Sequence, residues 1–509
     1  MGWIILIIYV IGWHVGMYML FKRAGIEGWK GLVPFYNTWI ITEKCKINKI
    51  WFWLQLIPIA GQFVTLWITI IFVMHFGRFS LLDHTLTVVV PFIYLPYIAN
   101  DTKSTRWIGH EGVKRYKKST AREWIDAAVF AVVAATLIRT FVFEAYTIPT
   151  PSMEKTLLVN DFLFVNKMSY GPRLPQTPLS FPFVHNTLPM SLTTPSYLKW
   201  IQLDYKRLPG FGKVERNDVV VFNFPAGDTI INLEGYGSLK PYYDVLRMQY
   251  KGDREALKED YPLLVHPMDK TDNYIKRCVG VPGDDIMVKD AVLYVNGKPA
   301  HVPGGIQTDY IVKVGAQPLS EDFLNQELGM NVQQDGNGQI FDSEGNVFQW
   351  RDPSTYVMNL TAENAEKLKA IKGISVEKFV DNSTGQLFPY DNSANAWSVD
   401  NYGPIHIPKA GETITLDSRN INIYRRLISV YEGNKLEERG GKYFINGQET
   451  TTYTIKGNYY WMMGDNRHRS QDSRFWGFVP ETHVVGKASL IWFSWNNGPR
   501  WSRIFKPIK

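Results

Sequence analysis

Two polar side chains stand in surroundings that could make one a nucleophile and the other its base. Ser152 follows Pro149-Thr150-Pro151, and the two prolines stiffen an extended segment soon after a long apolar run. Lys276 lies in Tyr274–Val281, a mostly apolar stretch that predicts a buried strand. Burial lowers the pKa of a lysine, and a neutral amine can accept the proton of a serine hydroxyl. Considered singly, each residue is more often structural, as a serine that caps a turn or a lysine whose ammonium reaches solvent.

The densest run of polar residues begins at Gly464, between apolar strands predicted at Tyr459–Met463 and Val484–Phe493. It reads Gly-Asp-Asn-Arg-His-Arg-Ser-Gln-Asp-Ser-Arg-Phe-Trp-Gly. A run of this kind predicts a hydrogen-bonded loop. We expect Asp472 and Arg474 to hold the shape of this loop as an ion pair.

The sequence lacks the motifs that several classes of site would require. The motifs HExxH, CxxC and GxGxxG are absent, so neither a metal nor a cofactor is predicted. Cys45 and Cys278 are the only cysteines, and the topology predicted below separates them by a membrane, so no disulfide is expected. The net charge of +7 comes from basic clusters beside apolar runs, which membrane topology explains, so no nucleic-acid partner is predicted.

Four apolar segments are long enough to cross a bilayer, which takes about 20 residues in a helix. They are Gly2–Phe21, Ile50–Met74, Leu81–Ala99 and Trp124–Phe143. Asp83, His84 and Pro91 interrupt the third segment, so it could also be a re-entrant or buried stretch. We therefore expect a membrane region at residues 1–123 with three helices, followed by an anchoring helix at residues 124–143.

The charges of the connecting loops predict the orientation of these helices. Six lysines and arginines lie in the first loop and seven in the third, whereas the short second loop has only Arg78. Positively charged loops stay in the cytoplasm. We therefore expect a multi-pass protein of the inner (cytoplasmic) membrane, in contact with the lipid bilayer. The chain after Glu144 would lie on the periplasmic or extracytoplasmic side.

After Phe143 the pattern changes to short strands and tight turns, which predicts a mainly β domain over residues 144–509. Further strands are predicted at Asp218–Phe224, Ile286–Val288, Val292–Val295 and Lys442–Ile445, with turns at Asn296-Gly297 and Asn446-Gly447. We expect several small antiparallel sheets or a partly closed barrel. Inserted stretches are expected near 172–211, 235–269 and 304–438, the last with a helix at Thr361–Lys372 whose N-cap is Thr361.

Three motifs together strongly resemble the signature sequences of bacterial type I signal peptidases, the leader peptidase family with a Ser/Lys dyad. They are Pro-Thr-Pro-Ser-Met at 149–153, Tyr-Ile-Lys-Arg-Cys-Val-Gly-Val-Pro-Gly-Asp at 274–284, and the polar run from Gly464. They occur in the family's order, after a membrane anchor. The resemblance covers Trp124–Tyr170, Arg216–Phe224, Asp272–Lys298 and Asn458–Phe493, and it implies transmembrane helices followed by a signal-peptidase-like β fold.

The resemblance also implies an activity and a role for each matching residue. The activity is cleavage of N-terminal signal peptides from exported preproteins after a small-X-small motif. Ser152 would be the nucleophile and Lys276 the general base. Ser470 matches a serine that hydrogen-bonds the lysine amine, and Thr150 matches a hydroxyl residue that lines the oxyanion hole. Met153 matches the residue after the nucleophile, and the remaining matches are supporting residues: Asp465, Asp472 and Arg474.

The sequence departs from the family pattern in three places. His468 and Arg469 replace an Asp-Asn pair in the polar loop. Three helices before the anchor exceed the usual number, and the insert at 304–438 matches no part of the family. The longer membrane region and the insert indicate a Bacteroidetes-type member. Nothing in the sequence indicates an oligomeric state.

Other functions remain as alternatives. A self-cleaving Ser/Lys repressor shares the dyad but needs a helix-turn-helix and has no membrane helices. A histidine-based serine hydrolase needs a partner carboxylate and usually a Gly-x-Ser-x-Gly turn, which Ser152 lacks. The alternative from a different class is a catalytically silent, membrane-anchored binding or assembly factor derived from the same fold. Such a factor would have lost the nucleophile or the base, whereas both residues are present.

Overall fold

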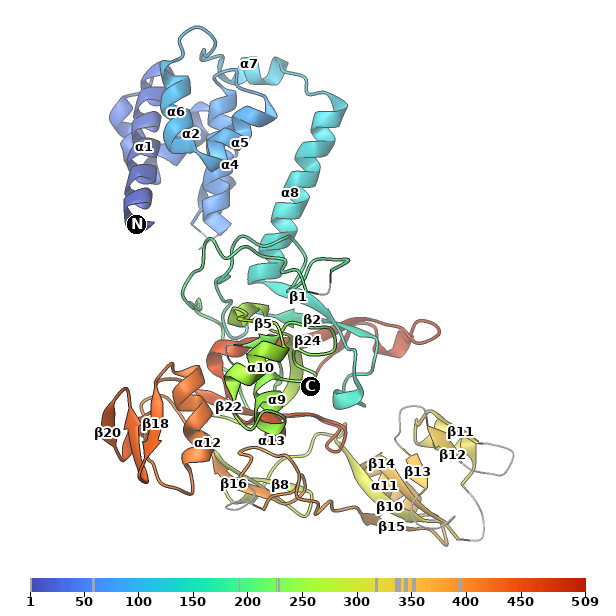
Figure 1. The fold of residues 1–509 in the computed structure, drawn as a ribbon. Coiled ribbons are helices and arrows are strands. Elements are labelled where there is room, and N and C mark those ends of the chain that lie inside the picture. Colours follow the sequence, from blue (N-terminus) through green and yellow to red (C-terminus); the bar gives the residue numbers. More distant parts are fainter. Residues whose placement is uncertain are drawn as a thin grey trace. The chain divides into compact units, whose positions relative to one another are not determined.

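A computed structural model describes most of the chain: residues 2–56, 60–191, 193–225, 227, 229–315, 319–334, 340–342, 347–349, 354–391 and 396–509. The chain divides into two compact units, Met1–Val133 and Ala134–Lys509. Helix α8 (Thr120–Phe141) contains the boundary between them and leads directly into strand β1 (Phe143–Thr147) (Figure 1). The predicted anchor at Trp124–Phe143 is therefore this helix, except that Phe143 already belongs to a strand.

The first unit is helical. Its elements are α1 (Gly2–Arg23), η1 (Gly28–Leu32), α2 (Tyr36–Lys44), α3 (Ile50–Leu54), α4 (Ala60–Met74), α5 (Leu81–Val89), α6 (Pro91–Asn100) and α7 (Gly109–Arg115). Its core lies between α1, α2, α4 and α6 and includes Met17, Leu20, Phe72 and Leu95. Within the described residues, α8 is the one helix that is both long enough and apolar enough to cross a membrane.

The second and third predicted membrane helices are wrong as single helices. The second consists of α3 and α4, and Gln55 and Leu56 form a turn after α3. The third is divided at Val90 into α5 and α6, because Pro91 has no N–H to continue the helical hydrogen bonds and becomes the first residue of α6. Asp83 starts α5 in a capping box with Ser80, so this carboxylate has a structural role there.

The second unit is built on one antiparallel sheet with the strand order β1-β2-β24-β3-β6-β22-β23, and β25 pairs with β24. Its further strands are β2 (Asp161–Asn166), β3 (Val219–Asn223), β6 (Asn273–Gly280), β22 (Tyr459–Met463), β23 (Val479–Pro480), β24 (Val484–Ser494) and β25 (Lys506–Pro507). The strands β3 and β22 are buried along their whole length, as their apolar sequences require. The strands predicted around Val219, Lys276, Tyr459 and Val484 are thus confirmed.

A second layer of small sheets contains the predicted hairpins. Strands β7 (Asp285–Lys289) and β8 (Val292–Val295) form the predicted hairpin, and the predicted turn at Asn296-Gly297 leads into β9 (Lys298–Pro299). Strand β16 (Tyr402–His406) pairs with β7. Strands β18 (Leu436–Arg439), β19 (Lys442–Ile445) and β20 (Gln448–Thr450) form another small sheet, and β17 (Thr413–Thr415) pairs with β21 (Thr452–Thr454). Helix α12 (Ile421–Arg426) and η5 (Leu427–Tyr431) pack on the core between these sheets.

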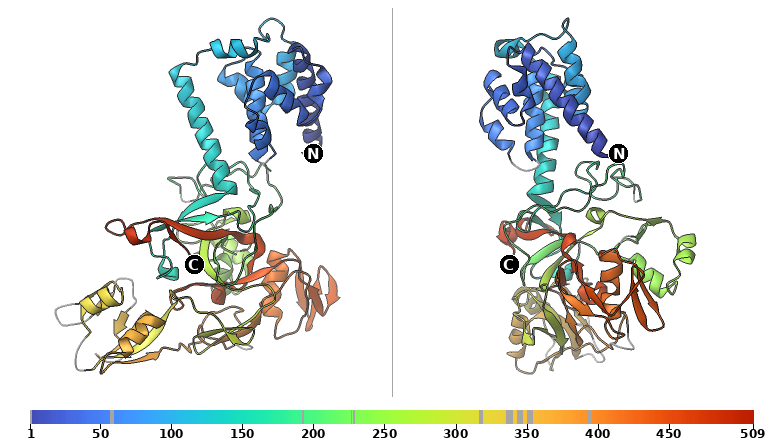
Figure 2. Two further views of the ribbon diagram at one scale, coloured as in Figure 1. Left: turned by 180° about the vertical axis from the view of Figure 1, so that it is seen from behind. Right: turned by 90° about the vertical axis from the view of Figure 1, so that its left-hand side faces the viewer.

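The stretch expected as one insert at 304–438 has two different parts. Strands β10 (Gln307–Lys313), β13 (Val347–Gln349), β14 (Thr355–Thr361) and β15 (Ser375–Lys378) form a separate sheet, and β11 (Val332–Gln334) pairs with β12 (Ile340–Asp342). With α11 (Ala362–Lys369) and η4 (Phe323–Glu327) they share a core of their own (Figures 1 and 2). We call residues 307–378 the inserted subdomain. The later part, from Tyr402, belongs to the neighbouring sheets, because β16 and β17 complete their pairing.

The helix predicted at Thr361–Lys372 ends earlier than expected. Thr361 caps it by accepting a hydrogen bond from the Asn364 N–H, as predicted, but α11 ends at Lys369.

The other two predicted inserts meet each other. Among its described residues, the stretch 172–211 forms isolated bridges and no named helix or strand. The stretch 235–269 contains α9 (Tyr242–Met248), α10 (Arg254–Asp260), the start of η3 (Met268–Lys270) and β5 (Leu263–Leu264), which pairs with β4 (Ile230–Ile231).

Candidate active site

Ser152 lies in a short 3₁₀ turn, η2 (Pro151–Met153), that follows strand β1. Pro151 begins the turn, where its missing N–H is not needed, and Thr150 before it is extended. Ser152 is buried, with 6% of its surface exposed. A buried serine hydroxyl in a rigid turn needs a hydrogen-bonding partner, and one reaches it from a distant strand.

That partner is Lys276, in the middle of β6. Its Nζ donates to Ser152 Oγ over 2.8 Å and to the Ile275 carbonyl over 3.0 Å. Only 3% of Lys276 is exposed, and the burial lowers its pKa from 10.5 to about 8, against the opposing effect of Asp472 and Asp465. The Lys276 amine can therefore be neutral near physiological pH while it touches the serine hydroxyl.

Each of the two acids near Lys276 has an arginine partner of its own. Asp465 accepts from Arg277 Nε at 2.7 Å and Nη2 at 2.6 Å, and both side chains are almost fully buried. Asp472 accepts from Arg474 Nε and Nη2, both at 2.9 Å, which confirms the predicted ion pair. Because each carboxylate is paired with an arginine, its electrostatic effect on Lys276 is small. Burial of the amine therefore decides the direction in which the Lys276 pKa shifts.

Burial alone would raise the pKa of Asp472, but Arg474 and two backbone N–H groups, those of Gly464 and Arg474, lower it below its usual value. Asp472 therefore remains ionised inside the protein. It holds the two ends of the polar loop together, because it accepts from the Gly464 N–H at 3.2 Å and caps the short helix α13 (Ser473–Trp476). The loop is rigid for this reason.

The polar loop also contacts the backbone around Ser152. The Asn466 N–H donates to the Ser152 carbonyl over 3.1 Å, and Asn466 Nδ2 donates to the Pro151 carbonyl over 3.4 Å. Gly464 is required here: a Cβ on it would lie 2.2 Å from Ser470 Oγ and 2.6 Å from the Ser152 carbonyl oxygen. Only a glycine allows the loop to come this close to Ser152.

Ser470 lies beside Ser152 but does not make the predicted hydrogen bond to Lys276. The structure has no bond between Ser470 Oγ and Lys276 Nζ, and Ser470 Oγ is buried without a partner. The lysine amine instead uses the Ile275 carbonyl.

The other predicted site residues gather around Ser152. Thr150 Oγ1 lies 3.4 Å from Ser152 Oγ, although Ser152 is in the 3₁₀ turn and only Thr150 is extended. Met153 is fully buried, and its Sδ accepts from the Asp465 N–H at 3.4 Å. Met153 also belongs to an apolar cluster next to Ser152, together with Ile148, Leu157 and Ile275.

Sequence reasoning missed several residues that build this site. Arg277 follows Lys276 directly, and its place in the motif at 274–284 indicated that it could matter. The neighbouring residues did not show that its partner would be Asp465, 188 positions later. Thr156 Oγ1 donates to Asp465 at 2.6 Å, and this too is a contact between distant segments. The roles of Gly464 and Asn466 depend on the approach of the loop to Ser152, which a single sequence does not reveal.

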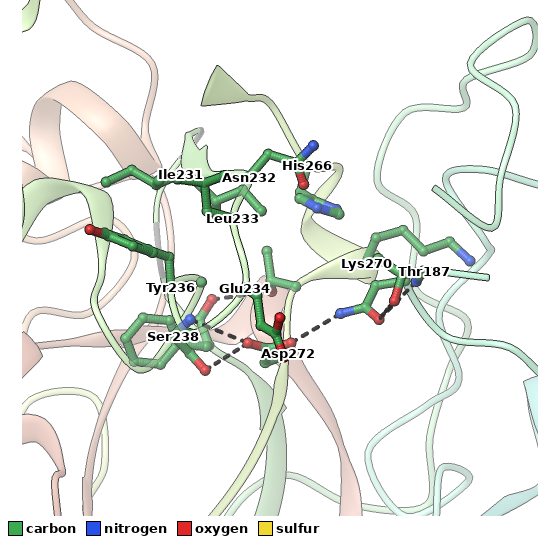
Figure 3. A pocket seen from close by; sticks show the side chains of 16 residues that line it. Thr187, Ile231, Asn232, Leu233, Glu234, Tyr236, Ser238, His266, Lys270 and Asp272 are labelled. Atoms are coloured by element: carbon green, nitrogen blue, oxygen red, sulfur yellow. Dashed lines mark hydrogen bonds between the residues drawn. The ribbon is translucent and has the colours of Figure 1, made fainter. Parts of the chain in front are cut away.

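Two cavities of about 220 Å³ lie apart from Ser152 and Lys276. Figure 3 shows the first, where the predicted inserts 172–211 and 235–269 meet. Two carboxylates, Glu234 and Asp272, line it. Asp272 accepts from Ser238 Oγ at 2.6 Å (Figure 3) and from Asn186 Nδ2 at 3.1 Å. No cluster of three or more metal-ligating side chains occurs among the residues that the structure describes.

Comparison with known proteins assigns most of the second unit to one family. A family model described as "Signal peptidase, peptidase S26" matches residues 121–349 and 407–495, more than half of the chain. These ranges include Ser152, Lys276 and the polar loop. A family of unknown function, DUF5684, matches residues 29–110, in the helical unit. The part left unmatched between the two peptidase ranges, 350–406, is shorter than the insert predicted from the sequence.

Curated relatives share this match over most of their length. Signal peptidase I of Haemophilus influenzae is 23% identical over 399 residues, which cover 77% of each chain. Signal peptidase I of Buchnera aphidicola is 25% identical over 402 residues, 77% of this chain and 84% of the relative. That of Pseudomonas aeruginosa is 23% identical over 384 residues, 72% of each chain. The chain belongs to the signal peptidase family, peptidase S26, and is a type I signal peptidase.

Proposed function

We propose that Ser152 and Lys276 form the catalytic dyad with which this serine peptidase removes signal peptides from preproteins. The observation that supports this most directly is the 2.8 Å hydrogen bond between Lys276, which is buried and has a lowered pKa, and the hydroxyl of Ser152. The neutral Lys276 amine takes the proton as Ser152 Oγ attacks the scissile carbonyl carbon. The resulting ammonium gives that proton to the leaving amine as the C–N bond breaks. Water, deprotonated by Lys276, then hydrolyses the acyl ester on Ser152.

The oxyanion that forms in each step needs hydrogen-bond donors already in place. We assign the Ser152 backbone N–H and the Thr150 hydroxyl to this role. The position of Thr150 supports it, since its Oγ1 is 3.4 Å from the nucleophilic oxygen. Ser470 keeps a supporting role in the proposal: its buried, unpartnered hydroxyl is free to turn toward the amine when Lys276 becomes an ammonium.

We infer that the substrate is extended near Ser152 and has small residues at the first and third positions before the cut. The family match supports this inference. The surroundings of Ser152 are apolar, because Ile148, Met153 and Leu157 belong to a buried core and Ile275 packs against it. Alanine at the first position should therefore be cleaved and phenylalanine rejected. Equal cleavage of both in a model preprotein would contradict this specificity.

The proposed location is the inner (cytoplasmic) membrane, with several passes and with the domain after Glu144 on the periplasmic or extracytoplasmic side. The loop charges and helix α8 support it. Protease added to spheroplasts with an intact inner membrane should degrade the peptidase domain. If the domain is cut only after the membrane is broken, the orientation is the reverse. In the proposed orientation, the partners of the protein are the lipid bilayer and preproteins with signal peptides.

Cleavage of a preprotein by the full chain in detergent tests the dyad. Ser152→Ala and Lys276→Met should abolish cleavage, and Lys276→Arg should fail as well because a guanidinium does not deprotonate. Matched controls are Ser429→Ala and Lys487→Met, which change a serine and a lysine outside the site and should leave activity near normal. Substantial activity in folded Ser152→Ala or Lys276→Met would contradict the dyad. A wild-type chain without activity would instead favour the catalytically silent assembly factor.

A further inference from the structure

The inserted subdomain contacts the polar loop at His468, one of the residues that departs from the family pattern. The His468 side chain is 7% exposed, and its Nε2 lies 2.8 Å from Asp400 Oδ2. Its Nδ1 lies 3.1 Å from the Asp309 backbone nitrogen, in β10 of the subdomain. A buried histidine with both ring nitrogens in hydrogen bonds has a fixed position and orientation.

The backbone decides which ring nitrogen of His468 carries the proton. The Asp309 N–H can only donate, so Nδ1 must accept, and the proton is on Nε2. Nε2–H then donates to the Asp400 carboxylate, which is 2% exposed and also accepts from the Asp381 N–H at 2.8 Å. His468 thus joins three segments: the polar loop, strand β10 and the stretch around Asp400.

Backbone pairing strengthens the same junction. The Gln307 N–H donates to the Asp465 carbonyl over 2.8 Å, and the Arg467 N–H donates to the Gln307 carbonyl over 2.9 Å. Strand β10 therefore begins as a parallel bridge to the polar loop. Next to it, Arg474 Nη1 donates to the Val399 carbonyl over 3.2 Å. The segment around Asp400 is in this way tied both to His468 and to the Asp472–Arg474 pair.

The subdomain also reaches the segment just after the nucleophile. Lys155 Nζ donates to the Gly329 carbonyl over 2.6 Å, from three residues beyond Ser152 to the inserted subdomain. The loop that His468 holds supplies the Asn466 N–H to the Ser152 carbonyl. The subdomain therefore contacts both the segment at Lys155 and the polar loop. The relative position of these two segments determines where Ser152 Oγ lies.

We propose that His468 is a positioning residue, through which Asp400 and the inserted subdomain hold the polar loop against the nucleophile Ser152. The inserted subdomain then supports the site through the contacts of Asp309 and Gln307 with the polar loop, while its own core stays outside the catalytic machinery. The proposal rests on the proposed function, because it presumes that Ser152 carries the reaction. His468 does not touch the substrate or the reacting atoms. Its loss should therefore impair catalysis and leave substrate binding nearly intact.

The test compares variants of the full chain in preprotein cleavage, with kcat and KM measured separately. His468→Leu, which removes the hydrogen bonds of both ring nitrogens, should lower kcat by about tenfold to a hundredfold, as small misplacements of reacting groups do, with KM changed less than about twofold. His468→Gln can still donate to Asp400 and His468→Asn can still accept from the Asp309 N–H, so each should recover part of kcat. Asp400→Leu should resemble His468→Leu.

A matched control separates positioning from general destabilisation. Leu368→Ala makes a cavity in the subdomain core, away from His468, and should lower the Tm without lowering kcat at a temperature where the chain is folded. The proposal is overturned if His468→Leu keeps a near-normal kcat, or if Leu368→Ala at an equal Tm loses as much kcat as His468→Leu. Cleavage that survives in Ser152→Ala would instead refute the proposed function, and that variant is assayed in parallel.

Discussion

Lys276 Nζ and Ser152 Oγ lie 2.8 Å apart, although 124 positions separate the two residues in the chain. Strand β6 brings the lysine to the serine, with Val220 of β3 as its cross-strand neighbour on one side and β22 on the other. A central strand of a buried sheet is an unfavourable place for an ammonium. The fold therefore keeps the destabilising Lys276 at the position where its neutral amine can accept a proton from Ser152.

The lowered pKa of Lys276 predicts the pH dependence of cleavage. With a pKa of about 8 set by burial, the amine is mostly protonated at pH 7 and mostly neutral at pH 9. Since only the neutral amine accepts the serine proton, kcat/KM should fall as the pH drops through about 8. A pH–rate profile on one preprotein checks this. An acid limb near pH 6 would indicate that another group titrates.

The same burial predicts that Lys276 costs stability. Lowering its pKa from 10.5 to about 8 corresponds to about 3 kcal/mol of unfolding free energy. The unfolded chain holds this proton up to pH 10.5, so the cost is full below pH 8 and disappears as the pH rises from 8 to 10.5. Lys276→Met should therefore be more stable than wild type at pH 7, by up to about 3 kcal/mol, and inactive. Equal unfolding midpoints for the two proteins at pH 7 would argue against a buried, strained lysine.

Thr150 offers a test of the oxyanion hole. Thr150→Val keeps the shape but removes the donor, and loss of one such donor typically lowers kcat by about 10²–10³. KM should change little, because the oxyanion exists only in the transition state. Thr150→Ser retains the hydroxyl and should keep most of the activity. Near-normal cleavage by Thr150→Val would place the second donor elsewhere.

Gly464 tests the close approach of the polar loop to the nucleophile. A methyl group there would lie 2.2 Å from Ser470 Oγ and 2.6 Å from the Ser152 carbonyl oxygen, so Gly464→Ala must displace Ser152 or the loop. We expect kcat to fall by about a hundredfold or more. The matched control is Gly457→Ala in the segment before β22, where a Cβ would meet nothing nearer than 3.9 Å. If both variants cleave alike, the loop does not need this approach.

The sequence predicted the local features of the fold well because they depend on local patterns. The apolar strands around Val219 and Tyr459, the Asn-Gly turns and the Thr361 cap all follow from residues within a few positions of each other. The breaks in the predicted membrane helices show the limit of this reasoning. Average hydropathy suggested one long segment at Leu81–Ala99, but Pro91 ended the hydrogen-bonding pattern and divided it.

The candidate site was predictable where motifs carry it and not where tertiary contacts do. Ser152, Lys276 and Thr150 stood out by their neighbours in the sequence. Arg277, by contrast, owes its role to Asp465, and His468 owes its role to Asp309 and Asp400. Those partners lie 68 or more positions away, and no periodicity links them. The division of the predicted insert was missed for the same reason, since the pairing of β16 with β7 joins distant segments.

Trapping the acyl-enzyme tests the central claim most directly. A single turnover of preprotein is quenched in acid, and mass spectrometry of the digested enzyme locates the residue that carries the acyl group. The dyad predicts a signal-peptide acyl ester on Ser152 in the wild type, and none in Ser152→Ala or in Lys276→Met. An acyl group on a different residue, or undiminished acylation of Ser152 in Lys276→Met, would contradict the assignment of nucleophile and base.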